Sequence, residues 1–202
     1  MKGARPLTEA EFRAVHGAMT GPLAARNRAL LVLGVRSGFR VSELLSLRQR
    51  DVLQHERVVS HVAVARRYMK KRVEGRTVYL HPKAAAELEA WLVELRRRPG
   101  YVGARTFVFK SYGQLATQNR PISRVQAWRV LRRAFDACEL SGKLGTHCMR
   151  KTFADRVFEQ LGRDLMRTQK ALGHRNVNST VSYLSFKEEE IEGAIARSGG
   201  DE

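Results

Sequence analysis

Acidic residues are scarce in this chain. Its 202 residues include 20 Asp and Glu against 37 Lys and Arg, so the formal net charge is +17 and the isoelectric point is about 10.8. An excess of this size favours a polyanionic partner, and nucleic acid is the commonest one. A basic protein without such a partner is the alternative. A membrane surface is a weaker rival, because no strongly basic amphipathic helix stands apart from the predicted core.

Cysteine is nearly absent, since Cys138 and Cys148 are the only two. Two cysteines make no disulfide framework, and neither lies in the spacing of a zinc site, which needs about four ligands. We therefore expect reduced thiols, a cytoplasmic location and no metal or other cofactor. The sequence also lacks an apolar run of the roughly 20 residues that a membrane span needs, and the apolar core of a signal peptide.

Apolar residues make up 43% of the chain, which is enough for a core, and their spacing predicts a mainly α fold with a small antiparallel β-sheet, an α+β class. Thr8 and Glu11 form a capping box that begins the first predicted helix. The next two helices begin at Pro22 and near Val41. Strands are predicted at residues 58–64 and 76–80, with a further short one at 107–109, because these segments are rich in β-branched or aromatic residues.

The second half of the chain is predicted to be helical from about residue 123. A helix over residues 123–140 is expected to bury Trp128, Leu131 and Phe135. Four further helices are expected near residues 147–161, 164–172, 177–184 and 187–196. No repeat or linker interrupts the pattern, so we predict a single domain over residues 1–202, with a core at 7–184 and a tail at 185–202.

Six dispersed residues have the chemistry of a phosphodiester-cleaving site. Two arginines, a lysine and two histidines suit a pentacoordinate phosphate, and a tyrosine hydroxyl could join that phosphate covalently. These residues are Arg40, Lys71, His147, Arg150, His174 and Tyr183.

Each of these residues also has an ordinary structural interpretation. Arg40 could be a surface arginine at a helix start, and Glu43 either an ordinary first-turn acid or the partner that holds a neighbouring cation. His174 could be a histidine at a helix end, and Tyr183 a core aromatic whose phenol, with a pKa near ten, needs nearby cations to become a nucleophile. His147 and Arg150 lie one turn apart, a common spacing that becomes informative only in combination.

Further basic residues are candidates for DNA contacts. The run at residues 66–72 would lie near the tip or edge of the sheet, where a lysine could protonate a leaving oxygen, although a solvated charge run explains most of it. The arginines of the 123–140 helix could read bases or attract phosphates without reading sequence. The candidates are Arg67, Lys70, Arg72, Arg124, Arg129, Arg132 and Arg133.

In combination, these pieces resemble the tyrosine recombinase (phage integrase) family, and the resemblance covers residues 7–184. The matching pieces are Gly38-Phe39-Arg40-Val41-Ser42-Glu43-Leu44, the hairpin lysine, Thr146-His147 with Arg150, Leu172-Gly173-His174, and Tyr183. The resemblance implies the integrase catalytic-domain fold and site-specific recombination of double-stranded DNA through a 3′-phosphotyrosyl intermediate, without ATP or metal.

The resemblance also implies a role for each residue. Arg40, Arg150 and His174 would stabilise charge on the phosphate, and Tyr183 would attack. Lys71 would be the general acid. It is preferred to Lys70 by counting back from residues 76–80, although Tyr79 stands where the family often has proline. His147 would help to move the tyrosine proton.

At the level of the whole protein, the resemblance implies a homotetramer on two DNA sites, accessory DNA-bending proteins and a nucleoid-associated enzyme. The separate N-terminal DNA-clamping domain of most members is not expected. The chain is either an excised catalytic fragment or, as we favour, similar to the single-domain recombinases of the fimbrial-inversion kind. The tail would pack on a neighbouring subunit or fold back on its own core. A type IB topoisomerase-like nicking and resealing enzyme and a non-catalytic DNA-binding relative are the alternatives.

Overall fold

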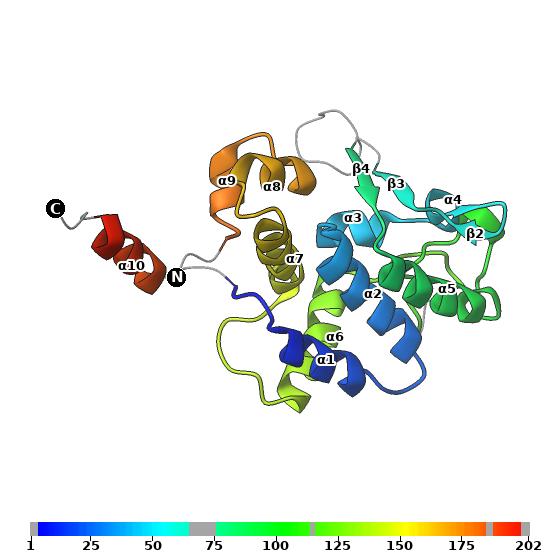
Figure 1. The fold of residues 1–202 in the computed structure, drawn as a ribbon. Helices are drawn as coiled ribbons and strands as arrows, with labels where there is room; N and C mark the ends of the chain where they lie inside the picture. The colour runs from blue at the N-terminus through cyan, green and yellow to red at the C-terminus, as the bar shows by residue number, and fades with distance from the viewer. Residues whose placement is uncertain (1–3, 65–75, 114–115, 185–187, 199–202) are drawn as a thin grey trace. The chain divides into compact units, whose positions relative to one another are not determined.

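The computed structural model describes residues 4–64, 76–113, 116–184 and 188–198, and these are mostly helical (Figure 1). The chain divides into two compact units, Met1–Phe153 and Ala154–Glu202. The mainly α fold with antiparallel strands that the sequence predicts is confirmed.

The first unit contains most of the helices. They are α1 (Glu9–Ala18), α2 (Ala24–Ser37), α3 (Val41–Ser46), α4 (Gln49–Val52), α5 (Pro82–Arg96), the short 3-10 helix η2 (Gly103–Arg105), α6 (Arg124–Ala137) and the first part of α7 (Thr146–Gln160). The predicted capping box at Thr8 and Glu11 begins α1, and a second box, of Ser123 and Gln126, begins α6. In each box, the side chains satisfy N–H groups that a helix start leaves unpaired.

Helices α2 and α5 lie side by side in the core of the first unit (Figure 1). Leu30, Leu31 and Leu33 of α2 are fully buried, as the apolar run in the sequence predicts. Trp91 of α5 is also fully buried, and its indole N–H donates to the Val108 carbonyl at 2.7 Å. The polar edge of this large side chain is therefore satisfied inside the core.

The strands form two small sheets, and the expectation of one sheet is thereby corrected. Strands β1 (Leu53–Gln54) and β2 (Arg57–Val58) make one antiparallel pair, and β3 (His61–Val64) and β4 (Arg76–Tyr79) make the other (Figure 1). In the second pair, Val62 faces Val78 and Val64 faces Arg76. The first hairpin escaped prediction because its turn residues, His55 and Glu56, both have positive φ without being glycine.

Two further expectations are wrong in detail. Residues 107–109 form no strand; Phe107 and Lys110 instead make isolated bridges to Arg48 and Pro121. Trp128 is not buried but 46% exposed, whereas Leu131 and Phe135 are fully buried as predicted. Its indole lies at the edge of the buried face of α6, next to Gly145, where one side of the ring can pack while the other faces solvent.

The second unit contains the end of α7 and the helices α8 (Leu165–Leu172), α9 (Val177–Val181) and α10 (Glu188–Ser198), close to the predicted ranges. Asp164 caps the start of α8 and Asn176 caps the start of α9. Gly173 ends α8 in the left-handed conformation, with φ +62°. Glycine adopts this conformation without steric cost, so the chain turns sharply at this point.

Candidate active site

Arg40 is held at the start of α3 by a carboxylate. Glu43 accepts a hydrogen bond from the Arg40 backbone N–H at 2.7 Å and another from the Arg40 Nη1 at 2.8 Å. The Glu43 side chain is only 1% exposed, whereas that of Arg40 is 36% exposed. A cation beside a helix N-terminus is unfavourable by itself, and Glu43 offsets this with its charge. The interpretation of Glu43 as the partner of a cation is therefore correct.

A second arginine, which the sequence did not indicate as a site residue, shares the same carboxylate. Arg76, the first residue of β4, donates from Nη2 to Glu43 Oε2 at 2.8 Å and from Nε to Glu43 Oε1 at 3.3 Å. Thirty-three positions separate Arg76 from Glu43, so no local pattern reveals the pair. The one sequence signal that could have indicated Arg76 is its position, as an arginine at the start of a predicted strand whose other residues are mostly apolar.

Glu43 is ionised at neutral pH despite its burial. Burial alone would raise the pKa of its carboxyl, but the hydrogen bond and charge of Arg76, with those of Arg40, bring that pKa below its usual value. A buried carboxylate between two guanidinium groups leaves one net positive charge. Of the two arginine side chains, that of Arg40 is the more exposed, at 36% against 12% for that of Arg76.

Arg150 is anchored to the same loop. It lies on α7, is 2% exposed, and donates from Nη1 to the Gly38 carbonyl. Arg76 Nη2 donates to that carbonyl as well, at 3.3 Å. The Gly38 carbonyl thus accepts hydrogen bonds from two arginines, two positions before Arg40 in the sequence. Any other residue would be strained there, because φ is +64° and an added Cβ would lie 2.3 Å from the Phe153 ring.

His147 precedes Arg150 by one helical turn and is exposed. Burial of part of its ring, with the charges of Arg124 and Arg150, lowers the pKa of the imidazole below 6.5. The ring is therefore neutral at pH 7 and has a nitrogen that can accept a proton.

The second unit brings His174 and Tyr183 together. Their ring centroids are 5.3 Å apart, with the planes tilted by 44°. The left-handed turn at Gly173 points His174 back over α9, where its Nδ1 lies 3.1 Å from the Thr180 hydroxyl. Gln169 also donates to the His174 carbonyl at 3.0 Å. Short helices and caps thus hold the histidine beside the tyrosine, nine residues away in sequence.

The structure describes some of the predicted site residues and not others. In the first unit, Arg40 is paired with Glu43, Arg150 donates to the Gly38 carbonyl, and His147 lies one turn before Arg150; in the second unit, His174 lies beside Tyr183. The hairpin residues lie outside the described part of the chain, and these are Arg67, Lys70, Lys71 and Arg72. The six-residue site as a whole stays a prediction.

The predicted arginines of α6 do lie on its surface. Arg124, Arg129 and Arg133 are exposed, while Arg132 forms an ion pair with Asp136 at 2.7 Å. Val125 is 56% exposed on the same helix. The face of α6 away from the core is therefore cationic, with Val125 exposed among the charges.

Neither a metal centre nor a membrane span is found among the residues that the structure describes. No group of three His, Cys, Asp or Glu side chains is arranged to hold a metal ion there. No helix in the same ranges is long and apolar enough to cross a bilayer.

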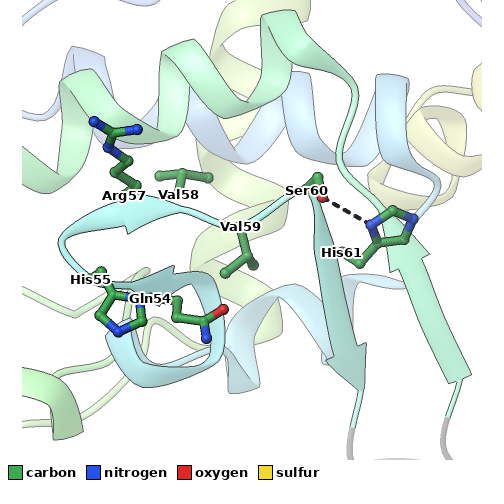
Figure 2. Close-up of a pocket in the computed structure, with 7 residues that line it drawn as sticks. All are labelled: Gln54, His55, Arg57, Val58, Val59, Ser60 and His61. Atoms are coloured by element: carbon green, nitrogen blue, oxygen red, sulfur yellow. Dashed lines mark hydrogen bonds between the residues drawn. The ribbon is translucent and has the colours of Figure 1, made fainter.

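A cavity of about 730 Å³ lies along the β1–β2 hairpin and the start of β3, and none of the residues that line it is a predicted site residue (Figure 2). His61 bonds to the neighbouring Ser60 hydroxyl at 2.9 Å, while His55 and Arg57 point in different directions (Figure 2). The polar groups do not converge on one point, so this cavity lacks the geometry of a reaction centre.

Comparison with known proteins gives a family and a fold. Residues 5–190 match the Phage integrase family. The probable integrase/recombinase YoeC of Bacillus subtilis (strain 168) is 29% identical over 175 residues, which are 87% of this chain and 86% of that protein. The tyrosine recombinase XerD of Mycobacterium tuberculosis (strain ATCC 25618 / H37Rv) is 32% identical over 166 residues, 81% of this chain and 49% of XerD. The chain thus spans about half the length of XerD.

Among solved structures, the XerH site-specific recombinase bound to palindromic difH substrate in a post-cleavage complex superimposes with a TM-score of 0.73. It is 23% identical, and the match covers 96% of this chain and 53% of XerH. At this identity the likeness establishes the fold, and the predicted integrase catalytic-domain fold is confirmed.

Proposed function

The chain belongs to the phage integrase family, and we propose that it is a site-specific DNA recombinase that cuts and rejoins DNA through a 3′-phosphotyrosyl intermediate. In the first step the Tyr183 oxygen bonds to the scissile phosphorus, the bond from phosphorus to the 5′ oxygen breaks, and that oxygen leaves as a 5′-hydroxyl. The tyrosine proton passes to a base, and a general acid supplies a proton to the leaving oxygen. A 5′-hydroxyl from another strand then reverses the step, so no external energy source is needed.

The observation that carries this proposal is the pair of arginines fixed on one loop. Arg150 and Arg40 are anchored through the Gly38 carbonyl and the Glu43 carboxylate. Among the described residues, Nε and Nη2 of Arg40 have no protein partner, so they can donate to non-bridging phosphate oxygens. Guanidinium groups that are held before the substrate arrives need no reorganisation during the reaction, which favours the charged transition state.

The contact between His174 and Tyr183 supports their assigned roles. His174 would donate to a phosphate oxygen, and the neighbouring Tyr183 hydroxyl would be the nucleophile. His147, whose pKa is lowered, would accept the tyrosine proton. The proposed donor to the phosphate, His174, and the proposed acceptor of the tyrosine proton, His147, are both side chains of this chain.

Lys71 is proposed as the general acid, with Lys70 as the alternative. Lys71→Ala should abolish cleavage of an ordinary substrate and spare a 5′-phosphorothiolate, whose sulfur leaving group needs no protonation. If Lys70→Ala behaves in this way instead, the assignment moves by one residue.

Double-stranded DNA is the proposed partner, bound by a homotetramer that holds two sites with the help of DNA-bending proteins, in the cytoplasm at the nucleoid. The charge of +17 supports the DNA partner, and XerH, which has the same fold, is a site-specific recombinase solved with its palindromic difH substrate. The exposed arginines of α6 would contact the groove or the phosphates. The tail, whose Ile191 and Ile195 are exposed on α10, would pack on a neighbouring subunit.

Two other functions use parts of the same site. A type IB topoisomerase-like enzyme would relax supercoiled plasmid without producing recombinants. A non-catalytic relative would bind DNA and never form a covalent adduct. Arg40 and Arg150 are both anchored to residues 38–43, and this favours catalysis over binding alone, because a protein that only binds DNA does not need two arginines held at one point.

The decisive experiment traps the intermediate. The protein is incubated with nicked duplexes drawn from junctions of host elements, in which the fragment beyond the cut is too short to stay annealed, and the products are separated on a denaturing gel. We expect a covalent adduct that Tyr183→Phe does not form. DNA binding by the wild type with no adduct on any duplex would refute the proposed reaction.

A further inference from the structure

Arg76 contacts both the Glu43 carboxylate and the Gly38 carbonyl, and the proposed mechanism does not use it. Its guanidinium donates twice to Glu43, and its Nη2 also donates to the Gly38 carbonyl. Its side chain is 12% exposed, so these bonds are largely shielded from water. A planar guanidinium can serve a carboxylate and a carbonyl together, which a lysine ammonium cannot do with the same geometry.

The bonds to Glu43 determine how much of that carboxylate is available to Arg40. With Arg76 in place, Glu43 Oε2 accepts from Arg76 and from the Arg40 backbone, and Oε1 accepts from Arg40 Nη1 at 2.8 Å. Two cations then share one anion. Without Arg76, Arg40 would be the only cation beside the buried carboxylate among the described residues, and the carboxylate would draw that side chain inward and offset its charge.

The bond to the Gly38 carbonyl acts on the other arginine. The carbonyl also accepts from Arg150 Nη1. Gly38 lies in a left-handed turn against the Phe153 ring, so the loop has little room to move. Arg76 therefore contacts both the acid that holds Arg40 and the carbonyl that holds Arg150.

We propose that Arg76 is a positioning residue for cleavage. By sharing the Glu43 carboxylate, it keeps the charged side chain of Arg40 extended toward the scissile phosphate. By donating to the Gly38 carbonyl, it keeps Arg150 in place beside Arg40. This inference rests on the proposed function. Arg76 does not touch DNA in this role, and it acts through Arg40 and Arg150. Because Arg76 begins β4, the same contacts tie the returning strand of the β3–β4 hairpin to the site.

The kinetic test compares full-length Arg76→Gln, Arg76→Lys and Arg57→Gln. Arg57 is the matched control, since it is an exposed strand arginine in the neighbouring hairpin. The probe is a nicked duplex with a randomised core, used at saturating concentration, and the readout is the single-turnover rate of adduct formation beside the DNA affinity. We expect Arg76→Gln to slow the adduct rate by roughly tenfold to a hundredfold, the scale of misplaced catalytic groups, while affinity changes by less than about twofold. Arg76→Lys should recover part of the rate, and Arg57→Gln should behave as wild type.

A double-variant comparison separates positioning from a general loss of structure. In an Arg40→Ala background, adding Arg76→Gln should slow the reaction much less than it does in the wild type, because the group through which it chiefly acts is gone. An equal additional loss in both backgrounds, or an unchanged rate for Arg76→Gln, would overturn the proposal.

A measurement without DNA keeps this inference distinct from the proposed function. The Nε–H signals of the arginines are recorded by nitrogen NMR in wild type and Arg76→Gln, with the Arg40 signal assigned from its loss in Arg40→Ala. The Arg40 signal should shift or broaden in Arg76→Gln and stay in place in Arg57→Gln. An unmoved Arg40 signal would refute the coupling between Arg76 and Arg40 even if the wild type cuts DNA. A moved signal in a protein that never forms an adduct would support the coupling and refute the proposed function alone.

Discussion

Replacing Gly38 with alanine adds one methyl group at a point where both the backbone and the surroundings oppose it. The φ of Gly38 is +64°, and its added Cβ would lie 2.3 Å from Cδ1 of Phe153. A left-handed conformation costs a non-glycine residue about 1–2 kcal/mol, and overpacking a filled core costs about 1–3 kcal/mol more. We therefore expect Gly38→Ala to lower the free energy of unfolding by about 2–5 kcal/mol.

Gly21→Ala is the matched control for this substitution. Gly21 also has a positive φ, +83°, but no atom lies within 4 Å of its added Cβ. It should therefore show the backbone cost alone, about 1–2 kcal/mol. The loss of unfolded-state freedom on changing glycine to alanine is the same in both variants and cancels in their difference. The remaining difference, about 1–3 kcal/mol, measures the contact with Phe153.

Urea unfolding followed by circular dichroism at 222 nm checks these values, with the thermal midpoint falling by about 2–4 °C for each kcal/mol in a chain of this size. Phe153→Leu should recover part of the Gly38→Ala loss in the double variant, because the smaller side chain can leave the added methyl room. Equal destabilisation by Gly38→Ala and Gly21→Ala, within about 0.5 kcal/mol, would show that the ring does not confine Gly38. Since Gly38 carries the carbonyl that holds Arg150, the same substitution should also slow adduct formation.

Three further predictions follow from single contacts. The Arg5 hydrogen bond, and to a smaller extent the Thr8 backbone N–H, lowers the pKa of Glu11 from its usual 4.5 to about 2 despite partial burial. Because this pKa is lower in the folded state than in the unfolded chain, the ion pair stabilises the fold above pH 4.5, and this stabilisation is lost as the pH falls toward 2. Glu11→Gln should therefore cost about 1 kcal/mol at pH 7 after allowance for solvent screening and almost nothing at pH 2 in parallel urea titrations, whereas a pH-independent cost would refute the ion pair. Because the pKa of His147 is lowered, the rate of adduct formation should fall at acidic pH with an apparent pKa below 6.5. The His147→Gln variant should lose this acidic fall in its pH–rate profile. An unchanged fall in that variant would assign it to another group. Deleting residues 186–202, which carry the exposed Ile191 and Ile195, should impair recombination more than DNA binding, and unchanged recombination would exclude the tail as a subunit link.

Much of the local structure could be predicted because its causes are local. The capping box at Thr8 and Glu11, the glycine that ends α8, and the apolar period of α2 each act within a few residues, and all three are present in the structure. The spacings of the two pairs could be predicted equally well. One helix, α7, carries His147 and Arg150, and a capped short helix, α9, lies between His174 and Tyr183.

The failures have physical causes of their own. Trp128 has the period of a buried residue, but only the packing of the loop at Gly145 decides that one side of its ring stays in water. The β1–β2 hairpin lacks the usual turn residues, since His55 and Glu56 take the left-handed conformation without glycine. In both cases the surroundings overrode a local preference.

By itself, the sequence determined the basic charge, the order of the helices, and the arginines, histidines and tyrosine of the proposed chemistry. Only the tertiary structure decided that Glu43 is shared by two arginines, that Arg76 is one of them, and that the Gly38 carbonyl joins Arg76 to Arg150. The reason is that charge and hydrogen bonding act through space between residues 33 and 112 positions apart, where the chain carries no periodic signal. Folding alone brings those groups within 3.5 Å of one another.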